Sequence, residues 1–146
     1  MGERACERIV LIVDDEASIR GLFSRILAIG GYLPIAADCT EEALTLLDAG
    51  LRPDAVILDL KMPGMGGLAL LMQLRARSQF RGIPTAIVTG DTFLSETTVN
   101  AAEALHAELH FKPMTMDELL ELTGRLLAPK PLPGSNGTRG SIDSRP

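Results

Sequence analysis

Acidic, hydroxyl and ammonium side chains stand directly after short apolar runs at four places along this chain. Asp14 and Asp15 follow the first run and Asp59 follows the third. Thr89 and Lys112 follow the fourth and the fifth. Three carboxylates brought close together repel one another unless a cation neutralises them, and Mg2+ is a hard cation that prefers oxygen ligands. The acids predict a magnesium site, provided that the fold brings the ends of these runs together.

A magnesium site with few protein ligands indicates phosphate chemistry. Mg2+ held in this way commonly completes its coordination shell with phosphate oxygens. The ammonium of Lys112 and the hydroxyl of Thr89 would supply the point charge and the hydrogen-bond donor that a phosphoryl group needs. One of the carboxylates could then be the nucleophile, because carboxylates form acyl phosphates and a cation lowers the repulsion between two anions.

Five short apolar runs predict the strands that position these residues. They cover residues 9–13, 33–37, 55–58, 85–88 and 107–111. Most of the runs are continuous rather than alternating, which is typical of parallel strands buried on both faces. Pro34, near the start of the second run, indicates an edge strand or a strand end.

Segments with helical spacing separate these runs. Thr40 is expected to cap the second helix, and a loop rich in Gly and Pro over 61–67 precedes the third. The fourth helix is expected to start near Leu94. Thr115 and Glu118 form a capping-box pattern that opens the last helix.

These elements predict an α/β fold built from five βα units. We expect a doubly wound five-stranded parallel sheet in a three-layer α/β/α sandwich. Ligands of such sheets bind beyond the carboxyl ends of the strands, where the polar residues stand. The domain is expected to span residues 8–128, after a short lead over 1–7 and before a disordered tail over 129–146 that is rich in Pro, Gly and Ser.

Composition excludes several functional classes. The chain has 146 residues, of which 46% are hydrophobic and 23% charged, and this fits one globular domain with a buried core. A net charge of -5, with one tyrosine, four phenylalanines and no tryptophan, argues against nucleic-acid binding. No apolar run reaches the roughly 18 residues of a spanning helix, and the first residues do not resemble a signal peptide. We expect a cytoplasmic protein without membrane insertion.

The motifs and their order resemble one family, the receiver domain of bacterial two-component response regulators. The motifs are Asp14-Asp15, Asp59 before the loop Lys61-Met62-Pro63-Gly64-Met65-Gly66-Gly67, Thr89 after the fourth strand, and Lys112-Pro113. The resemblance covers about residues 8–128. It implies the flavodoxin/CheY-like form of the fold and a signalling function that is switched by phosphorylation.

The resemblance implies a role for each of these residues. Asp59 looks like the phosphoacceptor, which takes a phosphoryl group from the phosphohistidine of a sensor kinase in a Mg2+-dependent reaction. The implied metal ligands are Asp14, Asp15, Asp59 and the main-chain carbonyl of Lys61. Thr89 is similar to the switch hydroxyl that moves toward the phosphoryl group. Lys112 is similar to the lysine that pairs with the phosphoryl oxygens.

Two positions bear on how such a switch would work. Leu109 stands three positions before Lys112, where the family usually has an aromatic second switch residue. An aliphatic side chain cannot report the burial of a ring edge in the same way, so we expect the coupling between Thr89 and the output surface to differ. Lys61 stands two residues after Asp59, where its side chain can reach the site mouth. We expect Lys61 to alter the lifetime of the phosphorylated form.

The resemblance also implies the partners. They are a sensor histidine kinase or phosphotransfer protein and a downstream protein effector, with no direct contact to nucleic acid. A phosphorylation-dependent dimer is a further alternative. The chain would be the substrate and catalyst of its own phosphorylation and autodephosphorylation, not an enzyme for a separate substrate. The sequence fits a stand-alone receiver or part of a longer protein whose linker starts at Pro129.

Two other functional classes remain as alternatives. One is an interaction module that works without phosphorylation. The other is an aspartyl-phosphate phosphohydrolase, which resembles a different arrangement with the nucleophile on the first strand in an Asp-x-Asp pattern. Residue 16 here is Glu16, and the candidate nucleophile follows the third run.

Overall fold

The computed structural model describes residues 7–128 of the chain; residues 1–6 and the predicted tail over 129–146 lie outside the described residues. The strands are β1 (Ile9–Val13), β2 (Leu33–Ala37), β3 (Ala55–Leu58), β4 (Thr85–Thr89) and β5 (Ala107–Phe111). The helices are α1 (Ala17–Ile29), α2 (Thr40–Asp48), α3 (Gly67–Ala76), α4 (Glu96–Ala104) and α5 (Met116–Leu127). Strands and helices alternate along the chain, as the spacing of apolar residues predicts.

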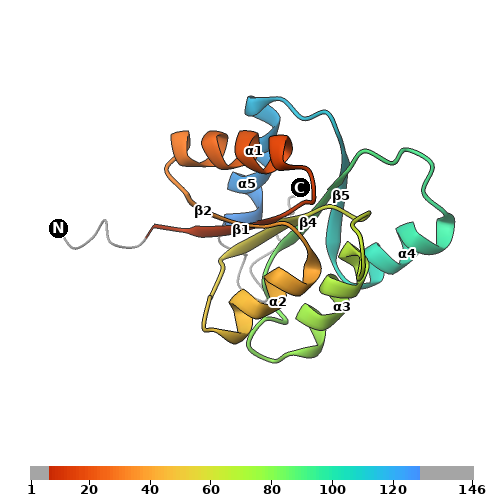
Figure 1. Cartoon of the computed structure of the whole chain (residues 1–146). Coiled ribbons are helices and arrows are strands. Elements are labelled where there is room, and N and C mark those ends of the chain that lie inside the picture. Colours follow the sequence, from red (N-terminus) through yellow and green to blue (C-terminus); the bar gives the residue numbers. More distant parts are fainter. Residues whose placement is uncertain (1–6, 129–146) are drawn as a thin grey trace, which may run out of the picture.

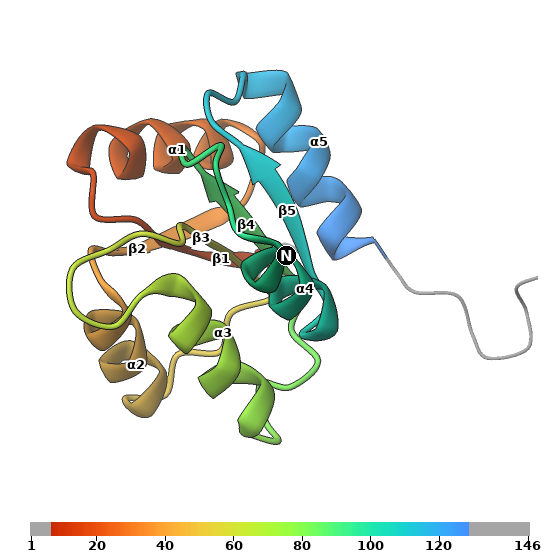
Figure 2. The same cartoon turned by 90° about the vertical axis from the view of Figure 1, so that its right-hand side faces the viewer.

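The strands form one parallel sheet in the order β2-β1-β3-β4-β5. Helices α1 and α5 cover one face of the sheet, and α2, α3 and α4 cover the other (Figure 1). Figure 2, turned by 90°, shows the same two helical layers with the sheet between them. From β1 the chain first adds β2 on one side of this strand, and it then returns to add β3 on the other side of β1. The predicted doubly wound α/β/α sandwich is confirmed.

Apolar side chains on both faces of the sheet explain the continuous runs. Val10 and Ile12 belong to the cluster under α1 and α5, whereas Leu11 and Val13 belong to the cluster under α2, α3 and α4. All four side chains are buried. A central strand covered on both sides needs an apolar residue at every position. Pro34 lies in β2, which is an edge strand, as its missing N–H predicts.

The register between β1 and β3 sets the position of the acidic residues. Val13 lies opposite Leu58 at the carboxyl ends of these strands. The pairing continues for one more step, because the N–H of Asp59 donates to the carbonyl of Val13 at 2.9 Å. Asp14 and Asp59 are the next residues of the two strands, so their side chains emerge next to each other.

One of the two predicted helix caps is confirmed. The Thr115 hydroxyl accepts a hydrogen bond from the Glu118 N–H, and the Glu118 carboxylate accepts one from the Thr115 N–H. The prediction that Thr40 caps α2 is wrong, because the capping residue is Cys39, whose sulfur accepts a main-chain hydrogen bond. The Thr40 hydroxyl is buried and donates to the Gly66 carbonyl at 3.0 Å, a contact between distant segments that local sequence does not reveal.

Gly67, the first residue of α3, packs directly against the main chain of Asp59. A Cβ atom at this position would overlap the Asp59 carbonyl oxygen and would lie 2.8 Å from Leu58 Cδ1. We expect Gly67→Ala to lower the free energy of unfolding by about 1–3 kcal/mol, as overpacking usually does. Chemical denaturation measures this change. Gly82→Ala is the matched control, because nothing lies within 4 Å of its added Cβ; equal stability of the two variants would contradict the close approach at Gly67.

Candidate functional site

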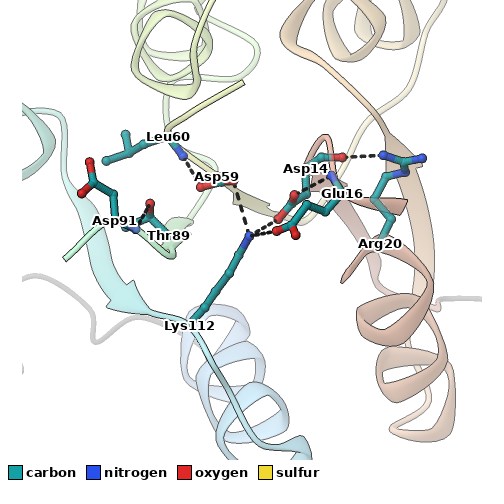
Figure 3. Close-up of polar contacts among 8 residues, drawn as sticks. All are labelled: Asp14, Glu16, Arg20, Asp59, Leu60, Thr89, Asp91 and Lys112. Carbon is teal, nitrogen blue, oxygen red and sulfur yellow. Dashed lines mark hydrogen bonds and ion pairs between the residues drawn. The ribbon is translucent and has the colours of Figure 1, made fainter. Parts of the chain in front are cut away.

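The carboxyl ends of the strands surround an open cavity of about 420 Å3. Its lining comes from four separate segments of the chain and consists of Asp15, Glu16, Asp59, Lys61, Thr89, Gly90, Asp91 and Lys112. Figure 3 shows the polar side chains of this edge converging from different strands. Parallel α/β sheets bind their ligands at this place, beyond the carboxyl ends of the strands.

Three carboxylates meet at the cavity. One oxygen each from Asp14, Asp15 and Asp59 lies within 4.8 Å of the others. Asp14 and Asp59 are only 3% and 6% exposed, whereas Asp15 is exposed. Burial raises the pKa of Asp14 above its ordinary value and the charge of Asp59 adds to the rise, although hydrogen bonds from Lys112 and from the Glu16 N–H oppose it. The cluster holds negative charge in a place that disfavours it, which is the condition under which a cation binds strongly.

The Lys112 ammonium faces the carboxylates. Its Nζ atom lies 2.8 Å from Asp14 Oδ2, 3.2 Å from Glu16 Oε1 and 3.4 Å from Asp59 Oδ2 (Figure 3). Burial alone would lower the pKa of Lys112, but the hydrogen bond with Asp14 and the charges of Asp14 and Asp59 outweigh burial and raise it. The lysine is therefore held in its charged form and neutralises part of the cluster.

Main-chain contacts hold the two buried acids in place. Asp59 Oδ1 accepts a hydrogen bond from the Leu60 N–H at 2.8 Å, and Asp14 Oδ1 accepts one from the Glu16 N–H at 3.0 Å. The Oδ2 atoms of both acids face Lys112. Each carboxylate thus has one oxygen fixed by its own loop and a second oxygen turned toward the ammonium.

Thr89 and Lys61 line the same cavity and both contact Asp91. Thr89 is the buried last residue of β4, and its side-chain oxygen accepts a hydrogen bond from the Asp91 N–H at 3.2 Å. Lys61 Nζ lies 2.9 Å from Asp91 Oδ2, and the lysine side chain is 74% exposed. Lys61 lowers the pKa of Asp91, and the Phe93 N–H lowers it further. Lys61 reaches the cavity mouth, but its charge is paired with Asp91 and not with Asp59.

Leu109 lies in the middle of β5, opposite Ile87 of β4. It is partly buried and packs against the apolar cluster under α2, α3 and α4. The side chain at this position is therefore part of the core on that face of the sheet.

Three contacts of the site are not predicted from the sequence. Glu16 reaches Lys112, Arg20 Nη1 donates to the Asp14 carbonyl at 2.7 Å, and Asp91 pairs with Lys61. The sequence does contain one signal for the last pair. Lys61 and Asp91 carry opposite charges and stand two residues after Asp59 and Thr89, whose strands are neighbours in the sheet.

A sequence model of the response regulator receiver domain matches residues 10–123. The chain is 35% identical over 120 residues to the DNA-binding transcriptional regulator NtrC of Salmonella typhimurium, a match that covers 82% of this chain and 25% of NtrC. It is 36% identical over 118 residues to the response regulator MprA of Mycolicibacterium vanbaalenii, covering 81% of this chain and 49% of MprA. The chain thus spans at most about half the length of these two relatives.

Solved structures of similar sequence share the fold over nearly their whole length. The chemotaxis response regulator CheY4 of Vibrio cholerae has a TM-score of 0.75 and 32% identity, with 83% of this chain and 99% of CheY4 covered. The response regulator TrrA of Thermotoga maritima, solved in complex with Mg(2+)-BeF, has a TM-score of 0.70 and 33% identity, with 82% and 99% covered. With these matches and the cluster of acids at the ends of β1 and β3, the chain belongs to the receiver domain family of two-component response regulators.

Proposed function

We propose that Asp59 accepts a phosphoryl group from a phosphohistidine donor and that this modification switches the contacts of the chain with other proteins. The observation that carries the proposal is the meeting of Asp14, Asp15 and Asp59 with the Lys112 ammonium at one edge of the sheet. Asp59 is the acid of this group that follows β3 and is in direct contact with Lys112.

The proposed reaction needs a nucleophile and charge neutralisation. A carboxylate oxygen of Asp59 forms a bond to phosphorus, while the bond between phosphorus and the imidazole nitrogen of the donor breaks. The Lys112 ammonium, 3.4 Å from Asp59 Oδ2, is placed to pair with a phosphoryl oxygen. The Thr89 hydroxyl lines the same cavity and supplies a further donor. Attack of water on phosphorus reverses the modification and releases inorganic phosphate.

We propose Mg2+ as the cofactor, held by Asp14, Asp15, Asp59 and the main-chain carbonyl of Lys61. The three acids offer oxygen ligands within 4.8 Å of one another, which suits a hard cation. When bound, Mg2+ supplies the positive charge that neutralises the acids and the incoming phosphoryl oxygens. The related protein TrrA, which was solved with Mg(2+)-BeF, supports the same ligand chemistry here.

We propose a sensor histidine kinase or a phosphotransfer protein as donor and a protein as the downstream effector. The chain is then both the substrate and the catalyst of its phosphorylation.

Some relatives, such as NtrC, are DNA-binding regulators, but the match covers only a quarter of NtrC. The net charge of -5 favours protein contacts over direct DNA contacts for this chain. We propose a cytoplasmic location, as membership of the receiver domain family suggests. None of the helices between residues 7 and 128 has the length and the apolar character of a membrane span.

Phosphorylation of Asp59 can be tested with a small phosphodonor. Incubation with Mg2+ and acetyl phosphate should add the mass of one phosphoryl group to the protein, as intact-mass spectrometry measures it. The increment should vanish in Asp59→Asn and with a chelator, and it should form more slowly in Lys112→Ala. Asp48→Asn, which changes an exposed acid at the end of α2, is the matched control and should keep the increment. An Asp59→Asn variant that still gains the mass would contradict the assignment of Asp59.

Repulsion among the acids should lower the free energy of unfolding of the protein when no metal is bound. We expect Asp59→Asn to raise the free energy of unfolding without metal by about 1 kcal/mol, because it removes one of three neighbouring charges. Thermal unfolding in a chelator should show a higher midpoint for the variant. Added Mg2+ should raise the midpoint of the parent more than that of the variant, since only the folded parent offers all three acids. A lower metal-free midpoint in Asp59→Asn would refute the repulsion.

Lys61 should influence how long the phosphoryl group persists. Its ammonium lies at the cavity mouth, so we expect Lys61→Ala to expose the phosphorylated acid to water and to shorten its half-life. An exposed charge contributes about 0.4–1 kcal/mol, which corresponds to roughly a two- to fivefold change in rate. Release of phosphate after removal of the donor measures this rate, with the exposed Arg81→Ala as control. An unchanged half-life in Lys61→Ala would remove this role.

A further inference from the structure

The loop between β3 and α3, residues 61–66, contains one of the proposed metal ligands, the main-chain carbonyl of Lys61. A side-chain ligand can adjust its position by rotating, whereas a main-chain carbonyl can move only with its loop. Groups that hold a ligand in place from outside a metal site change the affinity of that site for its metal. The contacts of this loop are therefore candidates for such a role.

The two ends of the loop are fixed close to the site. The Leu60 N–H donates to Asp59 Oδ1 at 2.8 Å, and the Leu60 carbonyl accepts a hydrogen bond from the Gly67 N–H at 2.9 Å. The Met62 side chain is buried in the core under α2, α3 and α4. Residues 63–65, by contrast, are exposed to solvent. The outer part of the loop therefore needs contacts with another element to keep one position.

Two side chains from the first turn of α2 supply these contacts. The buried Thr40 hydroxyl donates to the Gly66 carbonyl at 3.0 Å, and Glu41 Oε2 accepts a hydrogen bond from the Met65 N–H at 3.3 Å. No other side chain in the described part of the chain forms a hydrogen bond with the main chain of this loop. Figures 1 and 2 show α2 and α3 next to each other on the same face of the sheet.

Gly64 allows the loop to lie close to Glu41. Its φ of 75° is in the left-handed region that favours glycine, and an added Cβ atom would lie 2.9 Å from Glu41 Oε2. The N–H of Glu41 itself and the N–H of Met65 lower the pKa of the Glu41 carboxyl. The side chain is therefore charged at neutral pH, and a charged acceptor strengthens the hydrogen bond with the Met65 N–H.

We propose that Thr40 and Glu41 are positioning residues of the metal site, and that they raise its affinity for Mg2+ by holding the loop that contains the Lys61 carbonyl. This inference rests on the proposed function, in which Mg2+ is the cofactor. Neither residue lines the cavity around Asp59, so both act on the metal through the loop and not by direct contact.

Substitution of Thr40 tests this role. Thr40→Val keeps the shape of the side chain but removes the hydroxyl, whereas Thr40→Ser keeps the hydroxyl. The Gly66 carbonyl retains its hydrogen bond from the Leu70 N–H at 3.3 Å in both variants, so it is not left without a partner. We expect Thr40→Val to weaken Mg2+ binding about tenfold, as loss of a group that orients a ligand does, and Thr40→Ser to restore most of the affinity. Calorimetric titration of the unphosphorylated protein with Mg2+ measures the dissociation constant.

Thr123→Val is the matched control for a purely structural effect. Thr123 is also a buried threonine whose hydroxyl donates to a main-chain carbonyl, that of Leu119 at 2.8 Å, but both residues lie in α5. This variant should have a lower free energy of unfolding, measured by chemical denaturation in a chelator, and an unchanged affinity for Mg2+. Equal affinities of Thr40→Val and the parent would overturn the inference, and so would an equal loss of affinity in Thr123→Val.

Glu41 gives a second test at an exposed position, where a substitution leaves the core intact. Glu41→Gln keeps an acceptor oxygen for the Met65 N–H, whereas Glu41→Ala removes it. We expect Glu41→Ala to weaken Mg2+ binding roughly two- to fivefold, as loss of one hydrogen bond does, and Glu41→Gln to weaken it less. Equal affinities of the two variants would show that the hydrogen bond does not position the loop.

Phosphorylation distinguishes failure of this inference from failure of the proposed function. In Thr40→Val the Mg2+ concentration that gives the half-maximal rate of phosphorylation by acetyl phosphate should rise, whereas the rate at saturating Mg2+ should equal that of the parent. A parent that requires Mg2+, together with an unchanged Mg2+ requirement in Thr40→Val, overturns the inference and leaves the proposed function standing. A parent that binds no Mg2+ overturns both the inference and the proposed cofactor.

Discussion

Concentrated negative charge at one edge of the sheet is the constraint on which the other features of this protein depend. Asp14 and Asp59 are almost fully buried and lie close to Asp15. Buried charges are costly unless they are paired, and Lys112 provides part of that pairing from the end of β5. The site can exist only because β1, β3 and β5 run in the same direction and end at the same edge.

The rest of the fold makes this costly arrangement stable. Apolar clusters on both faces of the sheet bury nearly all residues of the central strands, and their burial is the main source of favourable free energy. The polar residues stand after the last apolar position of each strand, so the core and the site do not compete for the same positions. The loops that follow the strands are held by main-chain hydrogen bonds to the acids, such as those from Leu60 and Glu16. The packed core and these hydrogen bonds therefore hold the mutually repelling carboxylates in place.

Sequence reasoning predicts the parts of this protein that depend on periodic patterns. Runs such as residues 55–58 identify buried strands, and the rule that ligands bind at the carboxyl ends of parallel strands places Asp59 and Lys112 at one edge. Contacts between side chains of distant loops are not periodic. Thr40 has the right type for a helix cap, yet its hydroxyl bonds to Gly66, and Cys39 takes the cap. The pair of Lys61 and Asp91 depends in the same way on the paths of two loops.

The alignment of β1 with β3 has a further consequence for how this protein can vary. Side chains alternate between the two faces of a strand, so a shift of β3 by one residue would turn each core side chain to the wrong helical layer. The same shift would carry Asp59 away from Asp14, because both follow directly from the pair Val13 and Leu58. A chain that preserved its interior would thereby preserve the spacing of its acids. Selection for folding alone would keep positions 14 and 59 next to each other, whatever role the residues at these positions had in descendants of this chain.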